Sequence, residues 1–270
     1  MRLSVSNIAW DLAEEPAAAD LLAAAGVDQV DVAPGKYFAD PAQVSGADAE
    51  RVRRWWADRG FSVVGMQSLL FGTSGLNLFS DDGAMLARLS ALCRVGGLLG
   101  ARALTFGSPK NRDRSGLDDG AARRIAVEFF RRLGDAAAQN GVLVCLEPNP
   151  VIYGCNFMTD TAETAEVVRS VDHPAIRLQL DVGAIAASRE DPAQVIAAHA
   201  ELIGHVHASE PGLVPLGDAG APHAAAAAAL RNARPELTVT VEMAPAAAEP
   251  HLQALARAVA VAKAAYGAPA

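Results

Sequence analysis

Four polar residues end four apolar segments in the second half of the chain, and together they could hold a divalent metal ion. Glu147, Asp181, His207 and Glu242 are separated by 34, 26 and 35 residues, each about the length of one strand and one helix. Each follows an apolar or β-branched run that predicts a buried parallel strand. Because an unpaired buried charge costs several kcal/mol, these strand ends indicate a cation, a metal ion or a shifted pKa nearby.

The alternation of side chains along a strand supports this grouping. The residues one position earlier must face the outer helices, and all are apolar: Leu146, Leu180, Val206 and Val241. The residues two positions earlier must share the inward direction, and they form a small or polar layer: Cys145, Gln179, His205 and Thr240. All four strands therefore show the same alternation, with the strand-end residue on the inward side. This agreement favours a shared site over four unrelated salt bridges.

The ligand types narrow the choice of metal. Three carboxylates and one imidazole suit Mn²⁺, Mg²⁺ or Co²⁺ better than a site built on thiolates would, and Zn²⁺ also accepts such ligands. We therefore expect one divalent metal ion, with Mn²⁺ ahead of the other three.

Strand and helix signals alternate along the whole chain and predict the elements that position these residues. We predict strands at residues 2–8, 28–33, 61–66, 102–106, 142–147, 176–181, 202–207 and 237–242. We predict helices at residues 15–25, 47–59, 82–99, 118–140, 160–171, 192–199, 222–231 and 248–266. Eight units of this kind predict an α/β fold, a (β/α)8 TIM barrel spanning residues 1–270 as a single domain, with its chemistry at the carboxyl ends of the strands.

The segments after these strands supply candidate substrate contacts. Gln67 opens a long apolar segment after the third strand, where Phe71, Leu76 and Phe79 could exclude water. Lys110 and Arg112 belong to the most basic segment, after the fourth strand, and could hold an anionic group of the substrate. The alternative is a solvated loop whose cations pair with neighbouring aspartates.

Three further residues are candidates for the pocket. Tyr153 and Asn156 follow the fifth strand and could line it, although a packed loop tyrosine is equally ordinary. His205 lies one layer deeper than His207 by the strand alternation. It could support the metal site or contact the substrate, or it could be a core histidine with satisfied hydrogen bonds.

Composition excludes several classes of partner. The chain has 270 residues, a hydrophobic fraction of 51% and a net charge of −8, which argues against a general nucleic-acid or anionic-membrane surface. No apolar run approaches the length of a membrane span, and the start lacks the pattern of a signal peptide. Three cysteines without a paired motif suit a reducing compartment, so we expect a cytoplasmic protein. The formation of a homo-oligomer is compatible with this composition.

At the four strand ends the chain resembles the xylose isomerase-like family of barrels, in particular the branch of sugar phosphate isomerases and epimerases. The resemblance covers nearly the whole chain and is densest at Leu146–Pro150, Gly204–Glu210 and Val241–Glu242. It implies that Glu147, Asp181, His207 and Glu242 are the metal ligands. It also implies that Glu147 and Glu242 are the acid/base pair on opposite faces of a small sugar-like substrate.

Three positions depart from the pattern of the ketose 3-epimerases in that family. Ala184 stands where those enzymes carry a substrate-binding histidine, Tyr153 where they carry a glutamate and Leu213 where they carry an arginine. The metal ligands are kept and these substrate contacts are not. The departures favour a sugar-like or hydroxy-keto substrate other than a free ketohexose.

We expect an isomerase or epimerase that removes a proton next to a carbonyl and passes through a cis-enediolate. A metal-dependent dehydratase or lyase shares that first step and is the main alternative. A phosphodiester hydrolase like the abasic-site endonucleases is disfavoured by the acidic balance and the few histidines. A non-catalytic barrel that kept its metal site is the remaining alternative.

Overall fold

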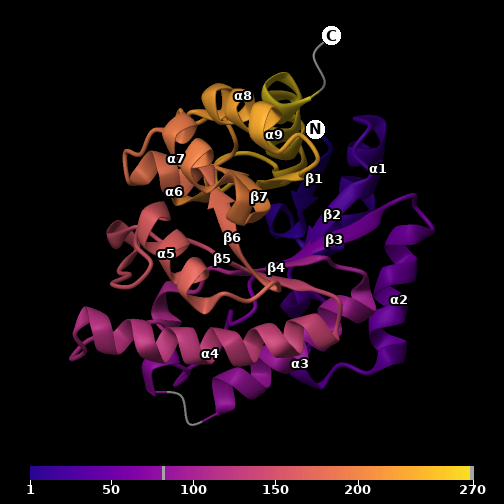
Figure 1. Cartoon of the computed structure of the whole chain (residues 1–270). Coiled ribbons are helices and arrows are strands. Elements are labelled where there is room, and N and C mark those ends of the chain that lie inside the picture. Colours follow the sequence, from indigo (N-terminus) through magenta and orange to yellow (C-terminus); the bar gives the residue numbers. More distant parts are fainter. Residues whose placement is uncertain (81–82, 268–270) are drawn as a thin grey trace.

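The computed structural model describes residues 1–80 and 83–267, and its strands form one closed parallel barrel (Figure 1). Neighbouring strands pair in chain order, and β1 pairs with β8 to close the cylinder. The strands are β1 Leu3–Ser6, β2 Gln29–Val32, β3 Ser62–Met66, β4 Ala103–Phe106, β5 Leu143–Leu146, β6 Ile176–Asp181, β7 Ile203–Ser209 and β8 Val239–Glu242. The predicted (β/α)8 barrel is confirmed.

The helices surround the barrel and cover its outer face (Figure 1). They are α1 Glu15–Ala24, α2 Gly46–Ala57, α3 Ala84–Leu99, α4 Asp119–Gln139, α5 Thr161–Val171, α6 Val182–Ala187, α7 Pro192–His199, α8 His223–Ala233 and α9 His251–Tyr266. The first residue of the helix predicted at 82–99 lies outside the described residues. None of the helices in the described ranges is long and apolar enough to cross a membrane.

The expectation of one helix after each strand is wrong for β6, because the short helix α6 precedes α7 there. Its cause is local: the side chain of Asp181 accepts a hydrogen bond from the main-chain N–H of Ala184 and so caps the first turn. The carboxylate that ends β6 therefore also begins a helix, which fixes the position of its own oxygens.

The alternation predicted along the strands is reflected in the core. Leu146, Leu180, Val206 and Val241 are fully buried and belong to the main hydrophobic cluster. Phe106 of β4 packs edge-on against Phe130 of α4, with 5.3 Å between ring centroids. This packing of strand against helix leaves the inward-facing positions of β5 to β8 for the polar residues described below.

Candidate metal and active site

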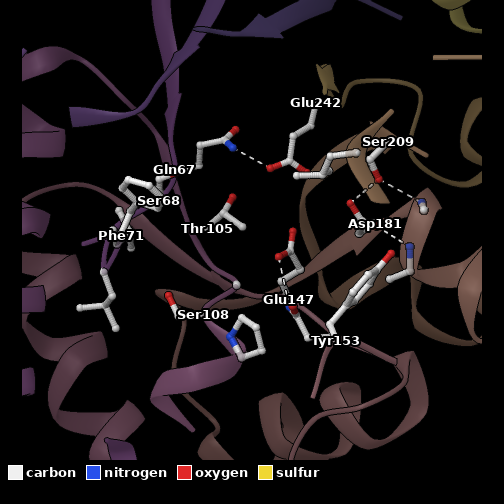
Figure 2. A pocket seen from close by; sticks show the side chains of 18 of the residues that line it. Gln67, Ser68, Phe71, Thr105, Ser108, Glu147, Tyr153, Asp181, Ser209 and Glu242 are labelled. Carbon is white, nitrogen blue, oxygen red and sulfur yellow. Dashed lines mark hydrogen bonds between the residues drawn. The ribbon is translucent and has the colours of Figure 1, made fainter. Parts of the chain in front are cut away.

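The four strand-end residues meet at the carboxyl end of the barrel. Glu147, Asp181, His207 and Glu242 each offer one ligand atom, and these atoms all lie within 4.8 Å of one another. Figure 2 shows the carboxylates of Glu147, Asp181 and Glu242 pointing into the same space. The geometry thus matches the convergence predicted from the strand ends.

His207 is the most deeply buried member of the set, with no exposed surface. Its Nδ1 lies 3.3 Å from Glu147 Oε1 and 3.1 Å from Glu242 Oε2. Within the described residues, Glu147 Oε1 and both ring nitrogens of His207 have no hydrogen-bond partner. Buried polar atoms that converge without hydrogen bonds are the arrangement expected of ligands around a cation, so these residues fit a divalent metal ion.

The pKa shifts of Asp181 and His207 also favour a bound cation. Burial and the charges of Glu147 and Glu242 raise the pKa of Asp181 to about 7. Burial alone would lower the pKa of His207, but Glu242 and Glu147 outweigh it and raise that pKa well above its ordinary value. A bound divalent ion would relieve the repulsion among the three carboxylates.

Neighbouring polar groups hold each carboxylate in place. Gln67 Nε2 donates to Glu242 Oε1 at 2.6 Å, and Ser209 Oγ donates to Asp181 Oδ2 at 2.7 Å (Figure 2). Asn149 Nδ2 donates to Glu147 Oε2 at 3.3 Å. These contacts orient the three carboxylates from outside the cluster, as neighbouring groups do in many protein metal sites.

Gly107, directly after β4, makes room for Glu147. A Cβ atom at this position would lie 2.1 Å from Glu147 Oε2, well inside van der Waals contact. A glycine is therefore required here by the close approach of the carboxylate rather than by the backbone conformation.

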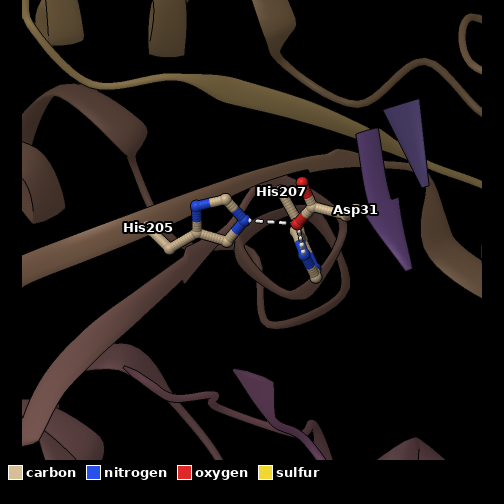
Figure 3. A group of neighbouring side chains, drawn as sticks. All are labelled: Asp31, His205 and His207. Atoms are coloured by element: carbon tan, nitrogen blue, oxygen red, sulfur yellow. Dashed lines mark hydrogen bonds and ion pairs between the residues drawn. The ribbon is translucent and has the colours of Figure 1, made fainter. Parts of the chain in front are cut away.

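A second polar group joins Asp31 and His205 to His207 (Figure 3). Asp31 of β2 and His205 of β7 are joined through Asp31 Oδ2 and His205 Nε2 at 2.7 Å, and Asp31 Oδ2 lies 4.0 Å from His207 Nε2. Asp31 Oδ1 accepts hydrogen bonds from Ser4 Oγ at 2.7 Å and Thr240 Oγ1 at 3.1 Å. Burial raises the pKa of Asp31, but His205, His207 and Ser4 together lower it below its ordinary value.

Asp31, His205 and His207 are also close enough to hold a metal ion by distance alone. Their oxygens and the His205 nitrogen are, however, engaged with one another and with hydroxyl groups. This group therefore fits the support of His207 better than a second metal site. It places His205 one layer below His207, as the alternation predicted, and agrees with the supporting alternative rather than with a substrate contact.

A cavity of about 750 Å³ opens above the four residues. Three of the predicted substrate contacts line it: Gln67, Lys110 and Tyr153. Ala184, Tyr153 and Leu213, the positions that depart from the ketose 3-epimerase pattern, all line it as well. The departures therefore change the wall of this cavity directly.

The structure does not bring the other three predicted contacts to the cavity wall. Arg112 is fully buried and donates to the main-chain oxygens of Ser108 and Glu147, so the alternative of a solvated loop is also wrong for it. Asn156 joins two loops through its side-chain bonds to Asp113 and to the main-chain N–H of Arg114. His205 faces Asp31 in the layer below.

Sequence reasoning missed several residues of the site. Asp31 carries a visible signal, because it is an acidic residue inside the apolar run of the second predicted strand. Ser209 and Gly107 carry no such signal. Their roles depend on which strands become neighbours and on how closely two chain segments approach.

Comparison with known families agrees with this architecture. The sequence profile described as "Xylose isomerase-like TIM barrel" matches residues 19–263. No protein with a curated description matches the sequence.

Solved structures with similar folds include enzymes of several activities. A D-psicose 3-epimerase crystallised with D-fructose has a TM-score of 0.80 at 19% identity, covering 99% of this chain and 100% of its own. The probable 3-DHS dehydratase AsbF from Bacillus anthracis has a TM-score of 0.73 at 16% identity, covering 97% and 98%. An AP endonuclease of family 2 from Brucella melitensis has a TM-score of 0.76 at 20% identity, covering 95% and 98%. At these identities the likeness shows the fold.

Proposed function

This chain belongs to the xylose isomerase-like TIM barrel family, and we propose that it is a divalent-metal-dependent isomerase or epimerase of a sugar or sugar phosphate. The observation that carries the proposal is the convergence of three carboxylates and one imidazole beneath a large cavity. Similar structures that include a D-psicose 3-epimerase and an L-ribulose 3-epimerase support the substrate class.

Glu147, Asp181, His207 and Glu242 would hold the ion, and their oxygen and nitrogen donors favour Mn²⁺, with Mg²⁺, Co²⁺ and Zn²⁺ as alternatives. When bound, such an ion supplies a Lewis acid that polarises a carbonyl and an adjacent hydroxyl. The Asp181 carboxylate accepts from Ser209 and Ala184, and His207 is enclosed completely, so these two residues serve as fixed ligands.

Glu147 and Glu242 are the proposed acid/base pair. Both line the cavity and keep about a tenth of their side-chain surface accessible, at 14% and 12%, whereas His207 has none. One glutamate would take the proton from the carbon next to the carbonyl, leaving a cis-enediolate. The other would return a proton, to the same carbon in an epimerisation or to its neighbour in an isomerisation.

Gln67 positions one member of this pair. Its amide donates to Glu242 Oε1 at 2.6 Å, while its own Oε1 is buried without a partner in the described residues. The contact leaves Glu242 Oε2 as the oxygen nearest His207. Glu242 Oε1 therefore accepts the hydrogen bond from Gln67, and Oε2 is left to bind the proposed metal ion.

A dehydratase that acts on a keto-sugar or keto-cyclitol is the second candidate. It requires the same proton abstraction and then expels a β-hydroxyl. The likeness to a probable dehydratase supports it at the level of the fold. Product analysis separates the two activities, since only dehydration releases water from the substrate.

Solvent-deuterium exchange tests the proposal. The metal-loaded protein should exchange the hydrogen next to the carbonyl of a ketose in D₂O, as followed by NMR across a panel of ketoses and their phosphates. Glu147→Gln and Glu242→Gln should abolish exchange while the protein remains folded. Because both residues are also proposed ligands, the metal content of each variant must be measured in the same samples.

A matched control is Glu128→Gln, which removes an exposed carboxylate from α4. It should retain exchange and metal. Exchange at the wild-type rate in both active-site variants would refute the assignment, and metal content without exchange on any ketose would favour a non-catalytic barrel.

A further inference from the structure

Several large hydrophobic side chains remain exposed on the loops that follow the strands, and two of them, Phe71 and Tyr153, line the cavity. Among the described residues, seven such side chains are exposed, and five belong to the loops after β3, β5 and β7. They are Phe71 at 86%, Val151 and Ile152 at 68%, Tyr153 at 41% and Val214 at 37%. Apolar surface gathered at one place on a protein marks a binding site more often than scattered exposure does.

Phe71, Tyr153 and Leu213 line the cavity together, and these three residues form an apolar rim next to the candidate active site. Phe71 and Tyr153 belong to the wall of the same cavity as Glu147 and Glu242. In Figure 2 Phe71 and Tyr153 lie on either side of Glu147. One bound molecule could therefore contact the carboxylates of Glu147 and Glu242 and the apolar rim at the same time.

The cavity is large for a bare monosaccharide. Its volume of about 750 Å³ lies in the upper part of the range of roughly 300 to 1,000 Å³ that encloses drug-sized ligands. A single hexose is smaller than such a ligand and would leave much of the space to water.

One part of the cavity wall offers few groups that could bond to sugar hydroxyls, whereas Ser68, Ser108 and Lys110 place polar groups elsewhere on the same wall. Ala184 and Leu213 have no polar side-chain atoms, and the Tyr153 hydroxyl already accepts a hydrogen bond from the main-chain N–H of Gly212 at 2.9 Å. Buried hydroxyls without partners would weaken binding, whereas an apolar group would gain by leaving water.

We infer that the rim formed by Phe71, Tyr153 and Leu213 is a subsite for an apolar or aromatic group attached to the sugar-like part of the substrate. The inference rests on the proposed function, because it assumes that the sugar-like part occupies the acidic end of the cavity. It assigns the preferred substrate to conjugates of sugars rather than free sugars.

Matched ketose ethers test the subsite directly. 1-O-methyl- and 1-O-benzyl-D-fructose share the carbonyl and hydroxyl groups of the reacting end, and the corresponding 6-O ethers place the same groups at the other end. By isothermal titration of the Mn²⁺-loaded protein, a benzyl ether should bind at least about tenfold more tightly than its methyl partner at one of the two positions. Equal affinity at both positions, or no binding of any ether, would overturn the subsite.

Two substitutions locate the preference. Phe71→Ser, which changes a highly exposed side chain, should remove most of the benzyl advantage, measured as the ratio of the benzyl-ether affinity to the methyl-ether affinity in the same variant. Leu98→Ser, on α3 and outside the cavity wall, should leave both affinities unchanged. An unchanged benzyl advantage in Phe71→Ser would overturn the assignment of the rim.

Two further readings separate this inference from its alternatives. If the benzyl advantage is present but no ketose exchanges deuterium, the subsite is supported and the proposed reaction is refuted. If ketoses exchange deuterium but the benzyl advantage is absent, the proposed reaction is supported and the subsite is refuted. If the rim instead packs against a second copy of the chain, Phe71→Ser should lower the mass measured by light scattering without a change in ligand preference, and the subsite is then refuted.

Discussion

Arg112 donates a hydrogen bond from Nη1 to the main-chain oxygen of Glu147 at 2.8 Å, and its side chain is fully buried. The guanidinium also donates from Nε to Ser108 O at 3.3 Å and lies 5.3 Å from the ring centroid of Phe106. A basic residue from the loop after β4 thus anchors the backbone of Glu147, a proposed metal ligand, at the end of β5. Arg112 does not line the cavity, so it influences the site through the main chain of Glu147.

Replacing this anchor should loosen Glu147. Arg112→Met should lower the free energy of unfolding by about 1 to 3 kcal/mol, because two main-chain oxygens lose a charged donor. It should also weaken metal binding. Urea denaturation and metal titration measure the two effects, and Lys110→Met, at an exposed neighbouring position, is the control for stability. Wild-type values for Arg112→Met in both assays would contradict the anchoring role.

Gly107 gives a sharper test of the position of Glu147. Gly107→Ala should displace the Glu147 carboxylate, because the added Cβ would lie 2.1 Å from Oε2. We expect metal affinity to fall by about tenfold or more while the circular dichroism spectrum is unchanged. Gly46→Ala is the control, since a Cβ there meets no atom within 4 Å. Equal metal affinities in the two variants would show that Glu147 does not depend on this space.

The fold and the convergence of the four strand-end residues followed from local patterns, but the residues that hold them in place did not. The ends of the last four strands were predictable because alternation fixes which side of a strand each residue faces. The burial of Arg112 was not, because a loop with several cations gives no indication of which one turns inward. The contact between Gln67 and Glu242 joins residues 175 positions apart, so it depends on how the barrel closes. Asp31 lay within a predicted strand, yet only the closed barrel brings it to His205.

Asp31 should matter for metal binding although it is not among the four proposed ligands. Asp31→Asn keeps the size of the side chain and removes the charge that faces His205 and His207. We expect metal affinity to fall by about 10- to 100-fold, the usual effect of losing a residue that orients a ligand. Asp28→Asn, an exposed carboxylate just before the same strand, should bind metal normally. Normal affinity in Asp31→Asn would assign the lower layer to packing alone.

Removing the metal should destabilise the protein. Three carboxylates crowd together when no cation separates them, and a ligand bound only by the folded state adds about 2.7 kcal/mol at a concentration of 100 Kd. EDTA should therefore lower the melting temperature, and added Mn²⁺ should restore it. Asp181→Asn should respond less and Glu128→Gln as fully as the wild type. A melting temperature that is indifferent to EDTA and Mn²⁺ would argue against the site.

Glu15 predicts a pH dependence that is independent of the metal. This residue begins α1 and is buried, and its Oε1 accepts from Tyr37 Oη at 2.7 Å. Burial raises its pKa above the ordinary value of 4.5, although the bond from Tyr37 works in the opposite direction. The folded protein therefore holds this proton more tightly than the unfolded chain does, and the stabilisation is lost as the pH rises through the folded pKa.

Glu15→Gln cannot titrate, so the comparison isolates this one carboxyl. The melting temperature of the variant relative to the wild type should rise as the pH increases from about 4 to about 7, because only the wild type must bury a charge at the higher pH. Glu50→Gln, which removes a partly exposed carboxylate that is paired with Arg53 on α2, should show no such rise, because that pairing lowers the pKa of Glu50. A difference between Glu15→Gln and the wild type that stays constant or falls over this range would mean that the Tyr37 and Asn7 hydrogen bonds, rather than burial, control the titration of Glu15.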